Sequence, residues 1–154
     1  MTIPASTVKD LPFDQRYAIG NKIERYVLDL IKKSTDPTAY IKPGLDKSGD
    51  IYSPKYKFLL EVKSQPDAVY CVSVELGRGS KENRRPSGIT TSTSDYYVWY
   101  CHKKLMIIKT VKLRELIENI PETEHPLHGE TYFLKILPIT TLEANCVKVL
   151  EAEI

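Results

Sequence analysis

Two acidic residues and a lysine near the middle of the chain have the types and spacing that metal-assisted chemistry requires. Asp50 follows Gly49, and after ten further residues come Glu61, Val62 and Lys63. Side chains alternate between the two faces of a β-strand, so Glu61 and Lys63 are expected on one face and Val62 on the other. A carboxylate and an ammonium would then lie side by side while Val62 enters the core.

The segment between Asp50 and Glu61 predicts a hairpin that brings the two carboxylates together. Ser53-Pro54-Lys55 has the composition of a turn, and a hairpin centred between positions 55 and 56 places Asp50 opposite Glu61. Directly paired residues have Cβ atoms about 4.5–5.5 Å apart. Two carboxylates that close repel each other unless a cation lies between them. Carboxylate oxygens suit Mg²⁺, which completes its shell with water and phosphate oxygens, and Mn²⁺ is expected to substitute for it.

This arrangement predicts hydrolysis of a phosphodiester. A metal ion held by Asp50 and Glu61 would polarise the phosphodiester and lower the pKa of a bound water. Lys63 would orient or help to deprotonate that water and offset the charge that builds on the phosphoryl oxygens. The alternative is a surface ion pair, but Phe58-Leu59-Leu60 and Val62 mark the strand as buried, where unpaired carboxylates are costly.

The pattern Gly49-Asp50, ten residues, then Glu61-Val62-Lys63 resembles the PD-(D/E)XK signature of restriction endonucleases, junction resolvases and many phage nucleases. The resemblance covers roughly residues 13–101 and departs from the signature at Gly49, where the family has proline. It implies that Asp50 and Glu61 bind the metal with help from the Val62 carbonyl, and that Lys63 serves the nucleophilic water. It also implies an acidic residue on the preceding helix. Glu24 fits that place, although a solvated helix position is the alternative reading.

A basic segment downstream predicts contact with the DNA backbone. Net charge is only +2, which does not indicate nucleic-acid binding by itself, but residues 78–85 hold four basic residues and one acid. Hydroxyls and free N–H groups that follow this segment are good phosphate partners. The candidate nucleic-acid contacts are Arg78, Lys81, Arg84, Arg85, Ser87 and Thr90. Glu75, just before them, is interpreted as a solvated residue or as part of a substrate or second-metal site.

Periodicity predicts the elements that would position these residues. A helix is expected over residues 13–33, and strands over 56–63, 69–76, 96–101, 105–109, 132–137 and 146–151. Residues 77–94 are expected to be a long loop, and Thr110 is expected to cap a second helix that ends before Pro121. The order predicts a single α/β domain over residues 1–154, with a restriction-endonuclease-like mixed central sheet flanked by helices.

Composition favours an intracellular globular protein, phage-encoded in a host cell if the resemblance to phage nucleases extends that far. Residues 1–9 lack the features of a signal peptide, and no apolar run approaches the roughly 18 residues that span a bilayer. Three widely spaced cysteines fit neither a disulfide framework nor a zinc site. His125-Pro126-Leu127-His128 is interpreted as a loop and not as a metal site, because no acid or cysteine stands at ligand spacing.

The sequence therefore predicts a Mg²⁺-dependent DNA endonuclease. Two alternatives stay open: a nucleic-acid-binding module of the same fold without catalysis, and an interaction protein that grips an acidic partner through residues 78–85. A homodimer is also expected, because paired strand cuts are most simply made by two copies related by a two-fold axis. The exposed edge of the strand at residues 146–151 would supply the contact.

Overall fold

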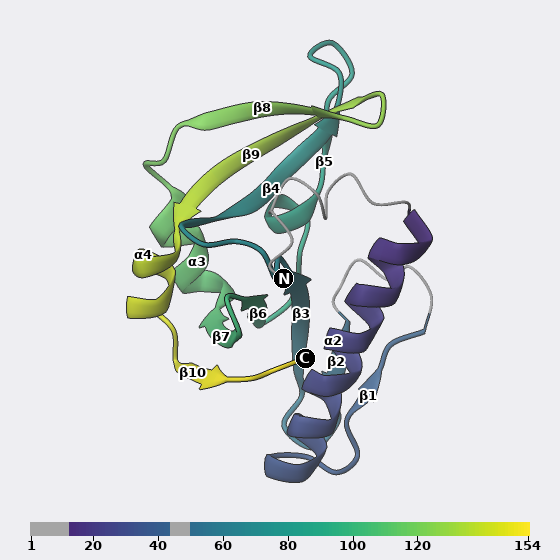
Figure 1. The fold of residues 1–154 in the computed structure, drawn as a ribbon. Coiled ribbons are helices and arrows are strands. Elements are labelled where there is room, and N and C mark those ends of the chain that lie inside the picture. The colour runs from purple at the N-terminus through teal and green to yellow at the C-terminus, as the bar shows by residue number, and fades with distance from the viewer. Residues whose placement is uncertain (1–12, 44–49) are drawn as a thin grey trace.

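Six strands form a mixed sheet, sheet A, at the centre of the molecule (Figure 1). The computed structural model describes residues 13–43 and 50–154; residues 1–9, Gly44 and Gly49, on which some expectations depend, lie outside this range. The strand order is β1-β2-β3-β6-β7-β10, in which β3 and β6 are parallel and all other neighbours are antiparallel. The strand bounds are β1 Tyr40–Ile41, β2 Ile51–Ser53, β3 Phe58–Ser64, β6 Tyr96–Cys101, β7 Lys104–Lys109 and β10 Lys148–Glu151.

A second, antiparallel sheet, sheet B, has the order β5-β4-β9-β8 and lies at one end of the molecule (Figure 1). Its bounds are β4 Cys71–Gly79, β5 Arg85–Pro86, β8 Glu122–Leu127 and β9 Glu130–Pro138. The helices of the described residues are α2 Phe13–Ser34, α3 Thr110–Ile117 and α4 Ile139–Ala144, with a 3₁₀ turn, η1, at Gly88–Thr90. The predicted α/β class with a mixed sheet is thus confirmed.

Sheet A is buried on both faces because it separates two hydrophobic clusters. One cluster joins α2 to the sheet through Ile23, Val27, Leu60 and Val98. The other packs Trp99 and its neighbours on the opposite face against β4, β9, α3 and α4. A strand covered on both sides has no polar face, which explains why β6 reads Tyr-Tyr-Val-Trp-Tyr-Cys without an alternating pattern.

The connection between the parallel strands β3 and β6 is made by β4, β5 and η1. Such crossovers are usually α-helices. Here the crossover contributes two strands to sheet B, and it returns the chain to β6 directly beside β3. The crossover therefore sets the surroundings of Glu61 and Lys63 on β3.

The predicted loop at residues 77–94 is only partly correct, because the segment contains the end of β4, the short strand β5 and the turn η1. β4 continues to Gly79, β5 pairs with β4 through Gly77↔Pro86 and Arg78↔Arg85, and η1 follows. Gly79 has a φ of +129°, and a Cβ there would lie 2.5 Å from the Asn83 carbonyl oxygen, so the turn after β4 needs glycine. β5 is polar and exposed, and backbone pairing with β4 holds it in the sheet.

Three smaller expectations are also corrected. The segment His125-Pro126-Leu127-His128 is not a loop: its first three residues end β8, where a proline is tolerated because β8 is an edge strand. Thr110 is the first residue of α3, and Lys109 is the N-cap. The strand expected over residues 69–76 is β4, which begins at Cys71, after the 83% exposed Tyr70, and continues to Gly79. The helix at residues 13–33 is confirmed as α2, and α4 was not predicted.

Candidate active site

The β2–β3 hairpin has the register that the turn arithmetic predicts. Ile51 pairs with Leu60 and Ser53 with Phe58, so continuing the register places Asp50 opposite Glu61. The Asp50 N–H donates to the Leu60 carbonyl oxygen at 2.7 Å. The Asp50 carboxylate accepts the Val62 N–H at 2.7 Å. Asp50 is therefore fixed against the strand that carries the other two predicted residues.

Glu61 and Lys63 form an ion pair on β3. Lys63 Nζ lies 3.2 Å from Glu61 Oε1, and the two side chains are 37% and 18% exposed. Val62 packs with the cluster under α2, as the alternation of a strand requires. Burial acts to lower the pKa of the Lys63 ammonium, but the negative charges nearby, Glu61 first among them, raise that pKa above its ordinary value. Lys63 is thus held in its charged form.

Helix α2 places Glu24 at the same site. Glu24 lines one pocket with Asp50, Glu61 and Lys63. Burial, followed by the charges of Asp50 and Glu61, raises the pKa of Glu24 to about 7. Burial and the Glu61 charge raise the pKa of Asp50 to about 6, although the hydrogen bond from Val62 opposes the shift. The three acids therefore repel one another, and the positive charges of Arg25 beside Glu24 and of Lys63 beside Asp50 do not compensate this repulsion.

The donor set fits a hard divalent cation. Carboxylate oxygens are the ligands that Mg²⁺ prefers, and a cation among these acids would relieve the repulsion that raises the pKa values of Glu24 and Asp50. In residues 13–43 and 50–154, no three side chains of histidine, cysteine, aspartate or glutamate already form a metal-binding group. Glu61 faces Lys63 in this arrangement, so ion binding would require its carboxylate to turn.

Two pockets meet at Glu61 and Lys63. The first, here called the acidic pocket, is lined by Tyr17, Gly20, Asn21, Glu24, Asp50, Glu61, Val62, Lys63 and Ser64. The second, here called the arginine pocket, is lined by Glu61, Lys63, Glu75, Arg78, Arg85, Pro86, Ser87, Gly88, Thr91 and Ser92. Glu61 and Lys63 therefore lie between a pocket lined by carboxylates and a pocket lined by guanidinium and hydroxyl groups.

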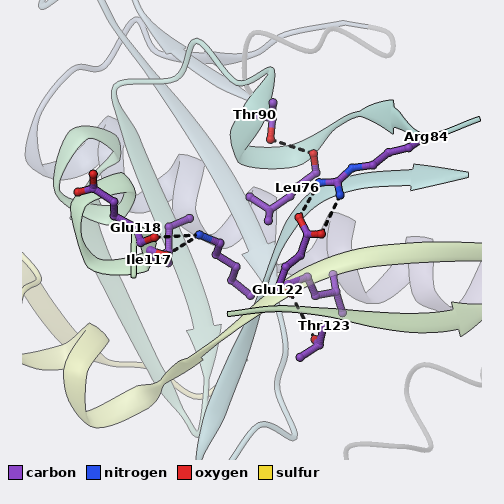
Figure 2. A network of polar contacts seen from close by, with 9 residues as sticks. Leu76, Arg84, Thr90, Ile117, Glu118, Glu122 and Thr123 are labelled. Carbon is purple, nitrogen blue, oxygen red and sulfur yellow. Dashed lines mark hydrogen bonds and ion pairs between the residues drawn. The ribbon is translucent and has the colours of Figure 1, made fainter. Parts of the chain in front are cut away.

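The structure divides the predicted nucleic-acid contacts into two groups. Arg78 and Arg85 line the arginine pocket, and Arg85 also forms an ion pair with Glu130 at 2.7 Å. Arg84 instead donates two hydrogen bonds to Glu122, at 2.7 and 2.6 Å (Figure 2). Its guanidinium also lies 4.3 Å from the centre of the Phe133 ring.

Lys81 resembles Arg84 in pairing with an acid of β8, because its Nζ lies 3.6 Å from Glu124 Oε2. Arg84 and Lys81 thus face acids of β8, on sheet B. The local excess of positive charge in residues 78–85 is partly balanced by acids that lie about 40 positions later in the chain.

The two predicted hydroxyl contacts also differ. Thr90 Oγ1 donates to the Leu76 carbonyl oxygen at 2.8 Å, which fastens η1 to β4 (Figure 2). Ser87 lines the arginine pocket, and its Oγ is buried with no hydrogen-bond partner in the described part of the chain. Ser87 therefore stays a candidate contact, whereas the hydroxyl of Thr90 has a structural partner. Glu75, which the sequence left as either a solvated residue or part of a substrate or second-metal site, also lines this pocket.

Several residues at the site were not predicted. Tyr97 pairs with Glu61 across β3 and β6, and burial together with the Glu61 charge raises the pKa of its phenol. Tyr17, Gly20 and Asn21 lie at seven, four and three positions before Glu24 on α2. Residues three, four and seven positions apart lie on one side of a helix. The helical period that predicted α2 would therefore have placed these three residues beside Glu24.

No family model matches the chain, and no curated protein or solved structure is similar to it. None of the helices within the described residues is long and apolar enough to cross a membrane.

Proposed function

We propose that this chain is a Mg²⁺-dependent endonuclease of the PD-(D/E)XK type that hydrolyses DNA phosphodiesters, with a restriction-endonuclease-like fold around its mixed sheet. The observation that carries the proposal is the hairpin register, which sets Asp50 against Glu61 and Lys63. Further support comes from Glu24, which α2 brings to the same pocket. Local sequence and long-range packing thus converge on one cluster.

Asp50 and Glu61 would hold the metal with the Val62 carbonyl. Glu24 would add a third negative charge to the same pocket. When bound, Mg²⁺ supplies Lewis acidity and lowers the pKa of its water. The Lys63 ammonium has three N–H donors. These donors can hold the attacking water and a phosphoryl oxygen once Glu61 turns to the metal, which offsets charge that develops on that oxygen.

The arginine pocket supports a phosphodiester substrate. It begins at Lys63 and continues to Arg78 and Arg85, so that a nucleic-acid backbone leaving the reaction centre would meet two guanidinium groups. Arginine pairs with phosphate through two parallel hydrogen bonds, and such contacts position the backbone without reading sequence. The remaining basic residues, Lys81 and Arg84, contribute to the stability of sheet B in this proposal.

The test is incubation of the chain with supercoiled, linear, single-stranded and branched DNA in Mg²⁺, in Mn²⁺ and in chelator. We expect cleavage that requires the metal and that is lost in Asp50→Asn. Metal binding is measured separately: Mg²⁺ should raise the melting temperature of the parent protein, because a ligand that binds only the folded state stabilises it. The same addition should leave the Asp50→Asn melting temperature nearly unchanged.

Cleavage that persists in chelator, or that Asp50→Asn retains, would overturn the proposal. A chain that binds DNA in a salt-dependent manner but cuts none of the four substrates would instead be a binding module. A chain that does neither would fit the interaction-protein alternative.

A further inference from the structure

A β-bulge in β4 brings Glu75 and Arg78 to the same face of sheet B. Residues three positions apart on a regular strand face opposite sides, but the pairing of β4 with β9 skips Leu76. The partners of Glu75 and Arg78 on β9 are Leu134 and Tyr132, which are two positions apart and therefore share a face. Both Glu75 and Arg78 line the arginine pocket. The bulge thus turns the Arg78 guanidinium toward the reaction centre.

The segment that follows β5 holds this bulge in place. The Leu76 carbonyl oxygen accepts the Ser87 N–H at 3.1 Å and the Thr90 hydroxyl at 2.8 Å (Figure 2). Gly88 has a φ of +57°, and a Cβ there would collide with the Glu75 carbonyl oxygen, so only glycine fits this contact. The bulge and η1 are therefore packed together, and Ser87 is fixed beside the arginine pocket.

Strand β5 places a second guanidinium beside that of Arg78. Arg78 and Arg85 pair directly across β4 and β5, so their Cβ atoms lie on one face at about 4.5–5.5 Å, where like charges destabilise a sheet. Acids offset part of this repulsion: Arg85 donates one hydrogen bond to Glu130 at 2.7 Å, and Arg78 interacts with Tyr132 and Glu75. Each guanidinium has five N–H donors. The pair therefore favours an anion that both side chains can contact.

Ser87 adds a hydroxyl donor to the two guanidinium groups. Its Oγ is buried and has no hydrogen-bond partner within residues 13–43 and 50–154. Leaving a buried hydroxyl unpaired is unfavourable, and Ser87 lines the arginine pocket together with Arg78 and Arg85. An oxygen of a bound anion would supply the acceptor that this hydroxyl lacks.

The charges of the arginine pocket match a doubly charged anion. Its lining includes three cations and two acids: Lys63, Arg78, Arg85, Glu61 and Glu75. When Glu61 turns to the metal, as the proposed function requires, three positive charges face one negative charge, a surplus of two. An internal phosphodiester carries one negative charge, whereas a phosphate monoester carries about −1.5 to −2 at pH 7 and has three strong acceptor oxygens. The donors and the charge thus suit a monoester better than a diester.

We infer that the arginine pocket binds the terminal phosphate of a DNA strand, and that this end directs cleavage to the phosphodiester beside it. This inference rests on the proposed function and names its substrate class, a DNA strand with a phosphate at its end. Lys63 lines both pockets, so a phosphate in the arginine pocket lies next to the one at the metal site. Arg78 and Arg85 contact its oxygens, and Ser87 donates to one of them. The same chemistry is present at a 5′ and at a 3′ phosphate.

The experiment compares linear DNAs of one sequence, with an internal label, that carry a 5′ phosphate, a 3′ phosphate or hydroxyls at both ends; a closed circle of DNA has no end. Binding is measured in the Asp50→Asn background without Mg²⁺, and cleavage is measured in the otherwise unchanged chain with Mg²⁺. The variants are Ser87→Ala and Arg78→Gln. The matched control is Lys81→Gln, which removes a charge from the same hairpin at a residue that faces Glu124 and does not line the pocket.

We expect the parent to bind and cut one of the phosphate-ended DNAs roughly tenfold better than the hydroxyl-ended DNA, and the preferred end identifies the 5′ or the 3′ phosphate. Ser87→Ala and Arg78→Gln should each weaken binding of that DNA by roughly tenfold, the size of one hydrogen bond to a charged group. Both should change binding of the hydroxyl-ended DNA much less. Ser87→Ala should keep the parent melting temperature, and Lys81→Gln should keep the parent ratio of affinities. The closed circle should be cut more slowly than the preferred linear DNA.

Equal binding of the three linear DNAs by the parent, or a parent-like ratio of affinities in both Ser87→Ala and Arg78→Gln, would overturn this inference. In either case a parent chain that cuts the linear DNAs or the closed circle with Mg²⁺ would leave the proposed function standing. A parent chain that cuts none of the DNAs, yet loses its preference for a phosphate end in both variants, would support the phosphate pocket while removing the nuclease activity. The two proposals can therefore fail independently.

Discussion

Removing one charge at a time from the acidic pocket separates the roles of its residues. Asp50→Asn and Glu61→Gln keep the shape of each side chain but remove a metal ligand, so both should abolish cleavage. Lys63→Ala should still bind metal, because it removes no oxygen donor, yet it should lose activity by about 10²-fold or more. Glu24→Gln should lose less than either of the first two. Cleavage rates in Mg²⁺, with metal-dependent melting as the second readout, check this order.

The same substitutions should affect DNA affinity in the opposite direction. Asp50→Asn and Glu61→Gln each remove a negative charge that faces a phosphate, so binding measured without metal should become tighter. Parent-like cleavage by all four variants would remove the catalytic assignment from this site and leave the binding-module reading in its place.

Asp36 is a buried carboxylate whose hydrogen bonds support the hairpin that carries the site. It is fully buried and accepts hydrogen bonds from Ser53 Oγ at 2.6 Å, the Thr38 N–H at 2.8 Å and the Lys55 N–H at 3.0 Å. Burial alone would raise the pKa of this carboxyl, but the hydrogen bonds from Ser53, Thr38 and Lys55 hold the pKa well below its ordinary value. Asp36 therefore ties the end of α2 to the turn between β2 and β3.

Asp36→Asn should lower the melting temperature by several degrees at neutral pH, because the amide cannot accept all of these hydrogen bonds. A carboxyl whose pKa is depressed in the folded state contributes stability above its unfolded pKa of about 3.9, and that contribution is lost as the pH falls through the folded pKa. The gap between parent and variant should thus be widest near pH 7 and shrink below about pH 4. Asp29→Asn, at an exposed position of α2, is the control; a gap that is independent of pH would contradict this account.

At the scale of elements, two neighbouring arginines are expected to have different roles. Arg85 on β5 is expected to contact the substrate, and Arg84, just before β5, is expected to stabilise the fold. Arg85 lines the arginine pocket while it pairs with Glu130, whereas Arg84 does not line that pocket and is held by Glu122 and the Phe133 ring. Arg85→Ala should reduce the slope of log affinity against log salt by about 0.7 on single-stranded DNA, or about 0.9 on duplex. Arg84→Ala should leave the slope unchanged and lower the free energy of unfolding by about 1 kcal/mol.

Salt titrations of DNA binding and denaturant unfolding of both variants measure these effects. If Arg84→Ala flattened the salt dependence as much as Arg85→Ala, the division of the basic segment would be wrong. DNA would then have to displace Glu122 from Arg84.

The elements that local sequence specifies were predicted, and those held by distant partners were not. The β2–β3 register follows from a short turn and therefore could be worked out from residues 50–63 alone. β5 and β8 are polar strands whose pairing depends on backbone groups, which leave no pattern in the side chains. The partner of Arg84 is Glu122, 38 residues later. A local charge count could not anticipate that neutralisation.

At the scale of the whole molecule, the candidate site lies where elements from both sides of sheet A meet. Helix α2 reaches it from one face with Glu24, and the crossover through sheet B reaches it from the other with Arg78 and Arg85. Among residues 13–43 and 50–154, the two that line both pockets are Glu61 and Lys63, in the carboxyl-terminal half of β3. A rigid, doubly covered sheet thus supplies the fixed centre, which catalysis by positioned charges requires.

The free edge of β10 predicts how two copies would associate. β10 pairs with β7 on one side and ends the strand order of sheet A, so its other edge is unpaired within the described residues. Antiparallel pairing of two β10 strands about a two-fold axis between Val149 and Leu150 places Lys148 of one copy opposite Glu151 of the other. Opposite charges across strands are favourable, so this edge suits self-association in that register. We therefore expect a homodimer, in solution or on DNA.

Lys148→Glu would set two acids against each other at both ends of the pairing. It should weaken the dimer by roughly tenfold, since each cross-strand pair contributes about 0.2–1 kcal/mol and like charges reverse its sign. The double variant Lys148→Glu with Glu151→Lys restores opposite charges and should restore the dimer, which a simple loss of folding could not do. Light scattering over a range of protein concentrations, with and without bound DNA, measures the mass. A monomeric parent under both conditions, or a double variant no better than Lys148→Glu, would exclude this interface.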